Sequence, residues 1–179
     1  MIIEQISEKT GISIKELLKW FLQKIIEFWC SGINKKGLLL EMHAQNTLLE
    51  VDSDFIPRRV VVRDFCSVRV DQFIRDRLNL PDIFKKKIID RNCYFSREQE
   101  YSLIYDYFIC HHFLYPMIKI CCKKYDLDFS YFNNYAQKVF NDNFTFDIFT
   151  NRCYGFADEV FVNRPPKIQV FSKTPFFRK

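Results

Sequence analysis

The sequence predicts an α+β fold, in which a small antiparallel β-hairpin or sheet at about residues 37–70 packs with a mostly helical C-terminal part. Two observations lead to this prediction. Apolar residues recur with helical spacing before and after this segment, whereas the segment itself contains two β-rich runs separated by turn-forming residues. A length of 179 residues suits one domain, so we expect a single domain over residues 1–179.

A helix is predicted to begin at Ser13, because Ser13 and Glu16 have the spacing of a capping box. It should end between Gly32 and Gly37. Its apolar residues recur every three or four positions, which is typical of one face of an amphipathic helix. These residues are Ile14, Leu17, Leu18, Phe21, Leu22, Ile25, Ile26, Phe28 and Trp29.

Residues 37–51 and 58–65 are predicted to form the two strands of an antiparallel hairpin. If the loop is centred near residues 54–55, the numbers of facing residues add up to about 110. Asn46 then lies near Asp64, and residue 47 near residue 63. Residues 66–71 extend the second strand or lead out of it.

The rest of the chain is predicted to be mainly helical. Ser96 and Gln99 form a second capping-box pattern, which begins a long helix reaching residue 124. Pro116 should kink or divide this helix because proline lacks a backbone N–H. Further helices are predicted at residues 71–78, 83–90 and 129–140, and the tail from residue 141 is compatible with a short strand near residues 160–162.

Composition and charge exclude several classes of protein. A hydrophobic fraction of 48% with 27% charged residues excludes a disordered chain or a coiled coil. The net charge of +5 is mild, and the basic runs at 85–87 and 123–124 are followed by acidic residues, so we expect no nucleic-acid partner. No run approaches the ~18 apolar residues that span a bilayer, so we expect no membrane association.

The seven cysteines are scattered along the chain and form no C-x-x-C pair or zinc-site spacing. Reduced, mostly buried thiols are the simplest interpretation, and together with the lack of a secretory signal they indicate a cytoplasmic protein. Cys121 and Cys122 are adjacent, but the next cysteine is Cys153, which does not give the spacing of a four-cysteine cluster. We therefore expect no iron–sulfur cluster.

Polar side chains inside the predicted hairpin are the candidates for chemistry. Glu41, His43 and Gln45 share a parity, so on one strand they project from one face. Asn46 has the opposite parity unless a bulge redirects it, and bulges are common beside active sites. The alternative interpretation is a hydrogen-bonded polar face on a solvent-exposed sheet.

The facing strand adds Arg63 and Asp64. A carboxylate such as Asp64 could hold Mg²⁺ together with an amide such as Asn46, because hard cations prefer oxygen ligands. His43 and Arg63 could contact anionic oxygens, the arginine with two hydrogen bonds. No P-loop, G-x-G-x-x-G, nucleophile elbow or H-E-x-x-H motif offers another site.

These residues also carry a resemblance to a known family. The pattern E-x-H-x-Q-N at residues 41–46, followed by R-D-F at residues 63–65, resembles the C-terminal, FhuF-like region of the IucA/IucC family of NRPS-independent siderophore synthetases. The similarity continues more loosely through the helical residues 111–140 and at residues 150–152.

The resemblance implies a reaction in which ATP converts a citrate-like carboxylate to an acyl-adenylate, which an amine or hydroxylamine then attacks. It implies Mg²⁺ and ATP as cofactors. By the same resemblance, Glu41 and Asp64 would hold the metal, Gln45 and Asn46 would line the nucleotide site, and the catalytic candidates are His43 and Arg63.

Family members also have an upstream region that grips the triphosphate, and the sequence contains no counterpart of it. Adenylyl chemistry depends on positive groups and metal that neutralise the phosphates. We therefore expect a truncated chain that is inactive alone and works with a second chain carrying the N-terminal region. A non-catalytic remnant, or a binding module that keeps the fold, is the alternative.

Overall fold

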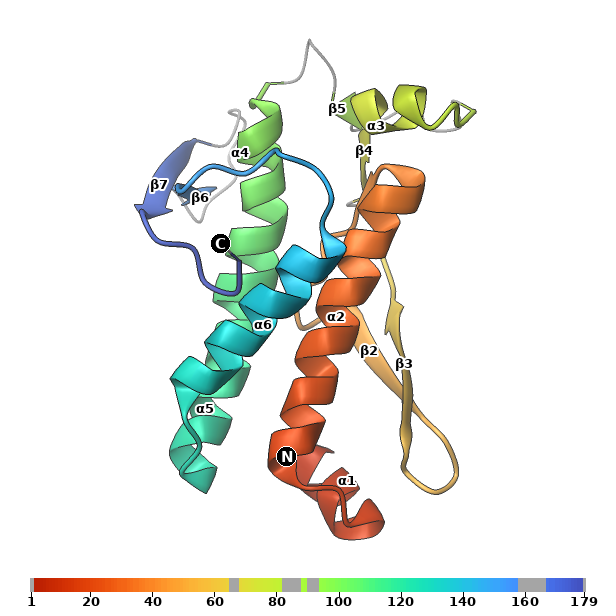
Figure 1. Cartoon of the computed structure of the whole chain (residues 1–179), viewed down its shortest axis with the longest axis vertical. Helices are drawn as coiled ribbons and strands as arrows, with labels where there is room; N and C mark the ends of the chain where they lie inside the picture. The colour runs from red at the N-terminus through yellow and green to blue at the C-terminus, as the bar shows by residue number, and fades with distance from the viewer. Residues whose placement is uncertain (1, 65–67, 82–87, 90–93, 158–166, 179) are drawn as a thin grey trace.

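The structure, a computed structural model, has the predicted α+β fold and describes residues 2–64, 68–81, 88–89, 94–157 and 167–178 (Figure 1). Long helices form most of it, and the strands make three small sheets. In chain order the elements are α1 (Ile2–Thr10), α2 (Ile14–Lys36), β1 (Leu38–Leu39), β2 (Thr47–Val51), β3 (Pro57–Val62), β4 (Arg69–Asp71), α3 (Gln72–Arg77), β5 (Ile88–Ile89), α4 (Arg97–Ser102), η2 (Leu103–Leu114), α5 (Tyr115–Tyr125), α6 (Phe129–Asn143), β6 (Cys153–Phe156) and β7 (Ile168–Ser172).

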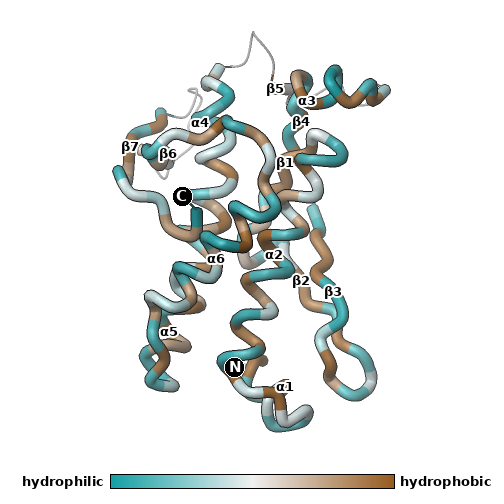
Figure 2. The backbone as a smooth tube through the Cα atoms, viewed as in Figure 1, coloured by the Kyte–Doolittle hydropathy of each residue, from teal (hydrophilic) through white to brown (hydrophobic). Residues whose placement is uncertain are grey.

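Helix α2 is the central element and begins and ends as the sequence predicts. Ser13 and Glu16 form the capping box, and Gly37 ends the helix with a left-handed φ of 61°. Hydrophobic and hydrophilic residues alternate along it in Figure 2, which reflects its buried and exposed faces. A Cβ at Gly37 would lie 2.8 Å from Cγ of Arg75 and 3.0 Å from the carbonyl oxygen of Asp71, so glycine also permits close packing of α3.

Helix α1 was not predicted from the sequence. It packs on α2 through the buried residues Ile3 and Ile6 and turns into α2 at Gly11, which has a φ of 73°. Glu4 binds Lys124 and Tyr125 at the end of α5. Contacts with other elements thus stabilise a helix that is too short to form alone.

The predicted hairpin exists, but its ladder is interrupted. Strand β1 pairs with β4 and β2 pairs with β3, both antiparallel. The prediction of one strand over residues 37–51 is therefore wrong between Leu39 and Thr47, where the chain leaves the ladder and makes a turn at residues 44–46. For residues 66–71 the sequence left two alternatives, and the extension of the second strand is confirmed for β4, which continues the antiparallel pairing after β3.

The register also differs by one residue from the prediction. Thr47 faces Val62 rather than Arg63. The pair nearest the loop, Val51↔Pro57, is centred on residue 54, and a bulge leaves Arg58 as an extra residue on β3, so that the pairing from Glu50↔Arg59 onward lies one residue closer to the prediction. Asn46 consequently faces Arg63, whose backbone N–H donates to the carbonyl of Asn46 at 3.0 Å.

The long helix predicted from Ser96 is present as α4, η2 and α5 in succession. Its capping box of Ser96 and Gln99 is confirmed. The middle part, η2, is a π-helix, and the α-helical pattern resumes with Pro116 in the first turn of α5. A proline cannot donate a backbone hydrogen bond, so the change of pattern falls where the sequence predicted a division.

Of the three further helix predictions, two are confirmed, and the third is wrong for the residues that the structure describes. Helices α3 and α6 lie where they are predicted, and Asp71 and Asp128 cap them. Of the helix predicted at residues 83–90, only residues 88–89 are described, and they form β5, which pairs in parallel with β4. Two β-branched isoleucines suit this pairing better than a helix. The strand predicted near residues 160–162 lies outside the described residues.

Asp71 joins β4 to the helices. Its side chain is fully buried and accepts hydrogen bonds from Arg97 Nε and the Tyr101 hydroxyl, both at 2.7 Å. It also caps α3 by accepting from the N–H of Ile74. Three donors compensate the burial of one carboxylate and fix the sheet that contains β1 against α4.

A mainly aromatic core lies between α2, η2 and α6. Trp29 is fully buried and contacts the rings of Tyr101, Tyr105 and Phe144. The C-terminal segment closes this core through Phe177, which is also fully buried. The described residues include no helix of the length and apolar character needed to cross a membrane.

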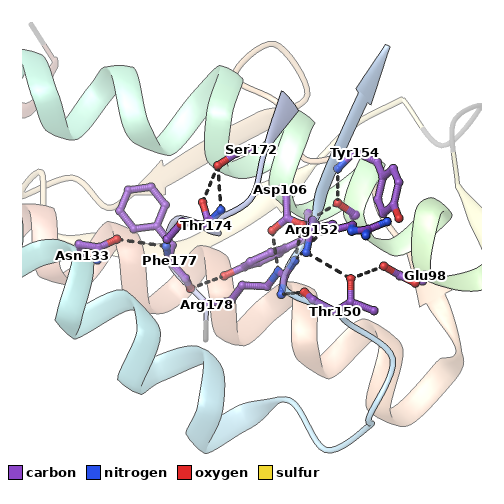
Figure 3. A network of polar contacts seen from close by, with 12 residues as sticks. Glu98, Asp106, Asn133, Thr150, Arg152, Tyr154, Ser172, Thr174, Phe177 and Arg178 are labelled. Carbon is purple, nitrogen blue, oxygen red and sulfur yellow. Dashed lines mark hydrogen bonds and ion pairs between the residues drawn. The ribbon is translucent and has the colours of Figure 1, made fainter. Parts of the chain in front are cut away.

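A buried polar network holds the C-terminal segment (Figure 3). Arg178 forms an ion pair with Asp106, with Nε and Nη2 donating to the two carboxylate oxygens at 2.7 and 2.8 Å. Ser102 donates to the same carboxylate at 2.6 Å, and Arg178 also donates to the carbonyl of Thr150 at 2.8 Å. This network ties the last residues to η2 and to the segment before β6.

Candidate functional site

All six residues nominated from the sequence lie where the hairpin ladder is interrupted. Residues 40–46 separate β1 from β2, and residues 63–68 separate β3 from β4. Glu41, His43, Gln45 and Asn46 belong to the first segment and Arg63 and Asp64 to the second. In such a break, side chains and backbone groups that a ladder would occupy can turn toward a ligand.

Hydrogen bonds to the backbone of His43 shape the first segment into a turn. The His43 carbonyl accepts from the N–H of Asn46 and from the hydroxyl of Thr47, both at 3.0 Å. The His43 Nδ1 atom accepts from the N–H of Gln45 at 3.3 Å. Because short polar side chains offer the backbone local partners, this stretch forms a turn instead of continuing the ladder. We call residues 43–47 the motif turn.

Arg63 ties the second segment to the motif turn. Its Nε donates to the carbonyl of Gln45 at 3.0 Å and its backbone N–H donates to the carbonyl of Asn46. The guanidinium therefore has a positioning role. Asp64 follows with a left-handed φ of 62°, a conformation that aspartate adopts more readily than most residues. This turn carries the chain out of the ladder and leaves the Asp64 side chain exposed.

The imidazole of His43 is directed by its neighbours. A ring nitrogen that accepts a hydrogen bond carries no proton, so the bond from Gln45 to Nδ1 places the proton of the neutral ring on Nε2. Nε2 lies 3.8 Å from Oε1 of Glu41. Both side chains are largely buried, with exposed fractions of 25% for His43 and 16% for Glu41. The imidazole can thus donate from Nε2, on the side where Glu41 lies.

The π-helix η2 contributes one wall of this site. The Phe108 ring lies 6.2 Å from the His43 ring and 5.9 Å from Phe156 of β6. Sequence reasoning missed Phe108, because its position beside His43 depends on a contact between distant segments, and it missed the Thr47 hydroxyl, because that bond to the His43 carbonyl forms only once the chain leaves the ladder. π-Helical segments are frequent at functional sites because they displace side chains from their α-helical positions.

The exposure of the remaining candidates differs. Gln45 is exposed, so a ligand can reach its side chain, whereas Asn46 is buried with an exposed fraction of 5%. The predicted arrangement of Glu41, His43 and Gln45 on one strand face is not found, because this segment is not a strand. The structure nevertheless brings His43 close to Glu41, and Arg63 close to Gln45 and Asn46, in one small region.

A metal held by protein ligands alone is not supported among the described residues, where no three His, Cys, Asp or Glu side chains lie together. Mg²⁺ that is bound with nucleotide phosphates needs only one or two protein carboxylates. Glu41 and Asp64 each carry the oxygen donors that this second mode uses, and their role as Mg²⁺ ligands stays a prediction.

Three comparisons with known proteins bear on this site. A family model described as "Ferric iron reductase FhuF-like transporter" matches residues 15–130, which include the whole interrupted hairpin. No curated protein matches the sequence.

Two solved structures share the fold. The ATP-bound aerobactin synthetase IucA from a hypervirulent pathotype of Klebsiella pneumoniae is 16% identical with a TM-score of 0.55, over 77% of this chain and 24% of that one. Another structure of the same synthetase is 14% identical with a TM-score of 0.56, over 80% of this chain and 26% of that one. The present chain therefore spans about a quarter of the length of these synthetase chains.

Proposed function

This chain belongs to the FhuF-like family, the C-terminal region of the IucA/IucC siderophore synthetases, and we propose that it is part of an ATP-dependent ligase of siderophore biosynthesis. The proposed reaction condenses a citrate-like carboxylate with an amine or hydroxylamine, in the cytoplasm where ATP is available. The fold likeness to a synthetase that binds ATP supports this proposal.

The observation that carries the proposal is the position of the six motif residues. They come from two segments 17 or more residues apart, and both segments leave the ladder at the same point of the hairpin. A polar sheet surface would need no such interruption. A break that gathers a histidine, two carboxylates, two amides and an arginine supports binding of anionic substrates.

The chemistry consists of two transfers. A carboxylate oxygen of the substrate attacks the α-phosphorus of ATP, and pyrophosphate leaves. The amine nitrogen then attacks the acyl carbon of the acyl-adenylate, AMP leaves with the bonding electrons, and the nitrogen loses a proton. Both steps move negative charge between oxygens, so fixed donors at those oxygens accelerate them.

The residues would divide this work as follows. His43 would donate from Nε2 to an oxygen of the carboxylate substrate, with Glu41 orienting the ring. Gln45 would contact the nucleotide, and Asn46 and Arg63 would hold the motif turn in shape. Glu41 and Asp64 would bind Mg²⁺ on the phosphates, where the metal would neutralise charge.

The groups that grip the triphosphate would come from elsewhere in a complete catalytic unit, for example from a second chain. The adjacent reading frame offers an inexpensive first observation. A neighbouring frame that encodes a triphosphate-gripping region would support a split enzyme, and a degraded frame would support the non-catalytic alternative.

The biochemical test is hydroxylamine-trapped AMP release with citrate and Mg-ATP, for this chain alone and mixed with the neighbouring chain. We expect release only in the mixture. Asp64→Asn should lower the rate by about a hundredfold, the usual effect of losing one charged or donor group at a phosphoryl centre. Asp54→Asn, at an exposed position in the same hairpin, is the matched control and should have no effect.

No AMP release in the mixture, or an undiminished rate in Asp64→Asn, would refute the catalytic assignment. Calorimetric titration of this chain with Mg-ATP then distinguishes a binding module from a non-catalytic remnant. Nucleotide binding without turnover would identify a binding module.

A further inference from the structure

A cavity of about 380 Å³ lies beside the motif turn, and none of the six candidate residues lines it. Its walls come from α1, α2, β2, η2 and α5. Volumes of 300–1,000 Å³ are typical of pockets for small molecules. The size therefore suits a single chain or ring.

The lining of this cavity is almost entirely apolar. Phe113 and Met117 line it from η2 and α5, and Cys121 of α5 adds a buried thiol with an exposed fraction of 2%. Burial raises the pKa of the Cys121 thiol, which keeps it neutral. Thr47 is the other lining residue with a polar side-chain atom. Its hydroxyl donates a hydrogen bond to the His43 carbonyl. An occupant would meet few polar atoms.

Polar contacts outside the cavity hold α1 in place as one wall. Glu4 of α1 binds both Lys124 and Tyr125 of α5. Hydrocarbon side chains surround the cavity, with exposed fractions of 58% for Ile2 and 56% for Ile120. Large exposed apolar side chains beside an apolar cavity are typical of a binding site.

The cavity borders the motif turn. Ala44 and Thr47 of the motif turn line it, while the residues between them, Gln45 and Asn46, belong to the polar site. A molecule whose apolar part lies in the cavity can therefore place a polar end at the motif turn.

We propose that this cavity binds the hydrocarbon chain of the amine or hydroxylamine substrate, whose nitrogen end lies at the motif turn. The inference rests on the proposed function, in which the carboxylate is citrate-like and only the amine or hydroxylamine can carry a hydrocarbon chain. A small molecule fits the geometry better than a docked polypeptide, because the walls come from five elements and the volume is that of a small-molecule pocket.

The test is calorimetric titration of the whole chain, without nucleotide, with two series of straight-chain compounds. One series contains butanoate, hexanoate, octanoate and decanoate, and the other contains the corresponding amines. Each added methylene should tighten binding by about fourfold until the cavity is full, after which affinity should level off. The amine series should bind more tightly than the carboxylate series, and tighter binding of the carboxylates would overturn the proposed orientation.

Two substitutions tie the binding to this cavity. Met117→Trp fills it and should abolish the dependence on chain length, whereas Lys123→Trp places the same side chain on an exposed position of α5 and should leave it unchanged. Phe113→Ala enlarges the cavity and should move the plateau to longer chains. This second variant keeps the test valid if the tryptophan variant does not fold.

Affinity independent of chain length, or unchanged in a folded Met117→Trp protein, would overturn the inference. So would a dimer in solution that Met117→Trp dissociates, because a second copy would then occupy the cavity. Chain-length dependence without AMP release would support the cavity and count against the ligase, and AMP release without chain-length dependence would do the reverse.

Discussion

At the scale of single residues, Asp64 has two separate roles. Its left-handed backbone turns the chain out of the hairpin ladder, and its exposed carboxylate is the proposed metal ligand. The backbone role depends on a short polar side chain that tolerates a positive φ, and the chemical role depends on charge. Different substitutions at Asp64 can therefore separate its backbone role from its chemical role.

We expect Asp64→Asn to preserve stability and Asp64→Val to destabilise the fold by about 1–3 kcal/mol, the cost of a β-branched residue in this conformation. Asp64→Gly should resemble asparagine. Urea denaturation measures the free energy of unfolding of each variant. Equal stability of the valine and asparagine variants would show that the positive φ imposes no constraint.

Burial at the same scale determines the chemistry of the cysteines. Cys30, Cys110, Cys121, Cys122 and Cys153 are free and buried. Burial raises the pKa of Cys30 and of Cys153 to about 12. Only the thiolate is a strong nucleophile, so both remain unreactive at ordinary pH.

Maleimide labelling at pH 8 followed by peptide mapping should leave Cys30 and Cys153 unmodified in the native protein. The same residues should be labelled fully in denaturant. Burial raises the pKa of both thiols, so their thiolate fraction at pH 8 is small in the native state. Rapid labelling at pH 8 without unfolding would contradict this expectation.

At the scale of elements, local sequence signals predicted the helices that carry them. Ser13 with Glu16 and Ser96 with Gln99 determine where α2 and α4 begin, and these contacts involve neighbours in the chain. Helix α1 has no such signal and depends on packing against α2. Strand β5 likewise depends on pairing with β4 across an intervening helix.

The candidate site illustrates the same limit. The sequence nominated its six residues, because polar side chains inside a β-rich run stand out and because they carry the resemblance to the IucA/IucC family; their roles in a reaction stay predictions. The sequence could not predict the motif turn, because hydrogen bonds to the His43 carbonyl compete with those of the ladder. The total free energy of the two sets decides whether the chain forms a turn or a strand. The Phe108 wall arises from a π-helix far along the chain, which no local pattern predicts.

Helix α1 gives a prediction at this scale. Lys124, together with Tyr125, lowers the pKa of Glu4 to about 2 from an ordinary value of 4.5. A lowered acid pKa stabilises the docked helix above about pH 4.5, and this contribution is lost as the pH falls toward 2. Glu4→Gln should therefore speed amide hydrogen exchange in residues 2–10 at pH 7.

The matched control for this helix is Glu8→Gln, which removes an exposed charge from the same helix. Hydrogen exchange monitored by mass spectrometry compares the peptide that covers α1 in both variants. Equal exchange rates would show that the ion pair does not hold α1 to α5.

At the scale of the whole molecule, one cluster of buried side chains extends from Ile3 to Phe177 and so joins the two ends of the described chain. The Asp106–Arg178 pair lies at its edge, with both residues 1% exposed. Removing one partner from such a pair leaves a buried charge, whereas removing both does not. The C-terminal segment should therefore contribute to global stability.

Arg178→Met should lower the free energy of unfolding by about 3–5 kcal/mol, because the Asp106 carboxylate loses its charged partner. Asp106→Leu combined with Arg178→Met should recover part of that loss. Urea denaturation tests both, with Lys173→Met as the exposed control. A single variant within about 1 kcal/mol of the unmodified protein would show that the pair contributes little.

The interrupted ladder has a consequence for how this hairpin can evolve. Seven residues lie between β1 and β2, and six between β3 and β4, so the break absorbs a one-residue difference in length. In an unbroken ladder, an insertion near the tip would shift the register and exchange the two faces of every paired residue down to the core. Here the shift stops at the break. Relatives could thus lengthen, shorten or resurface the tip without disturbing β1 and β4, which makes the hairpin a place where new specificity can arise at little cost to the fold.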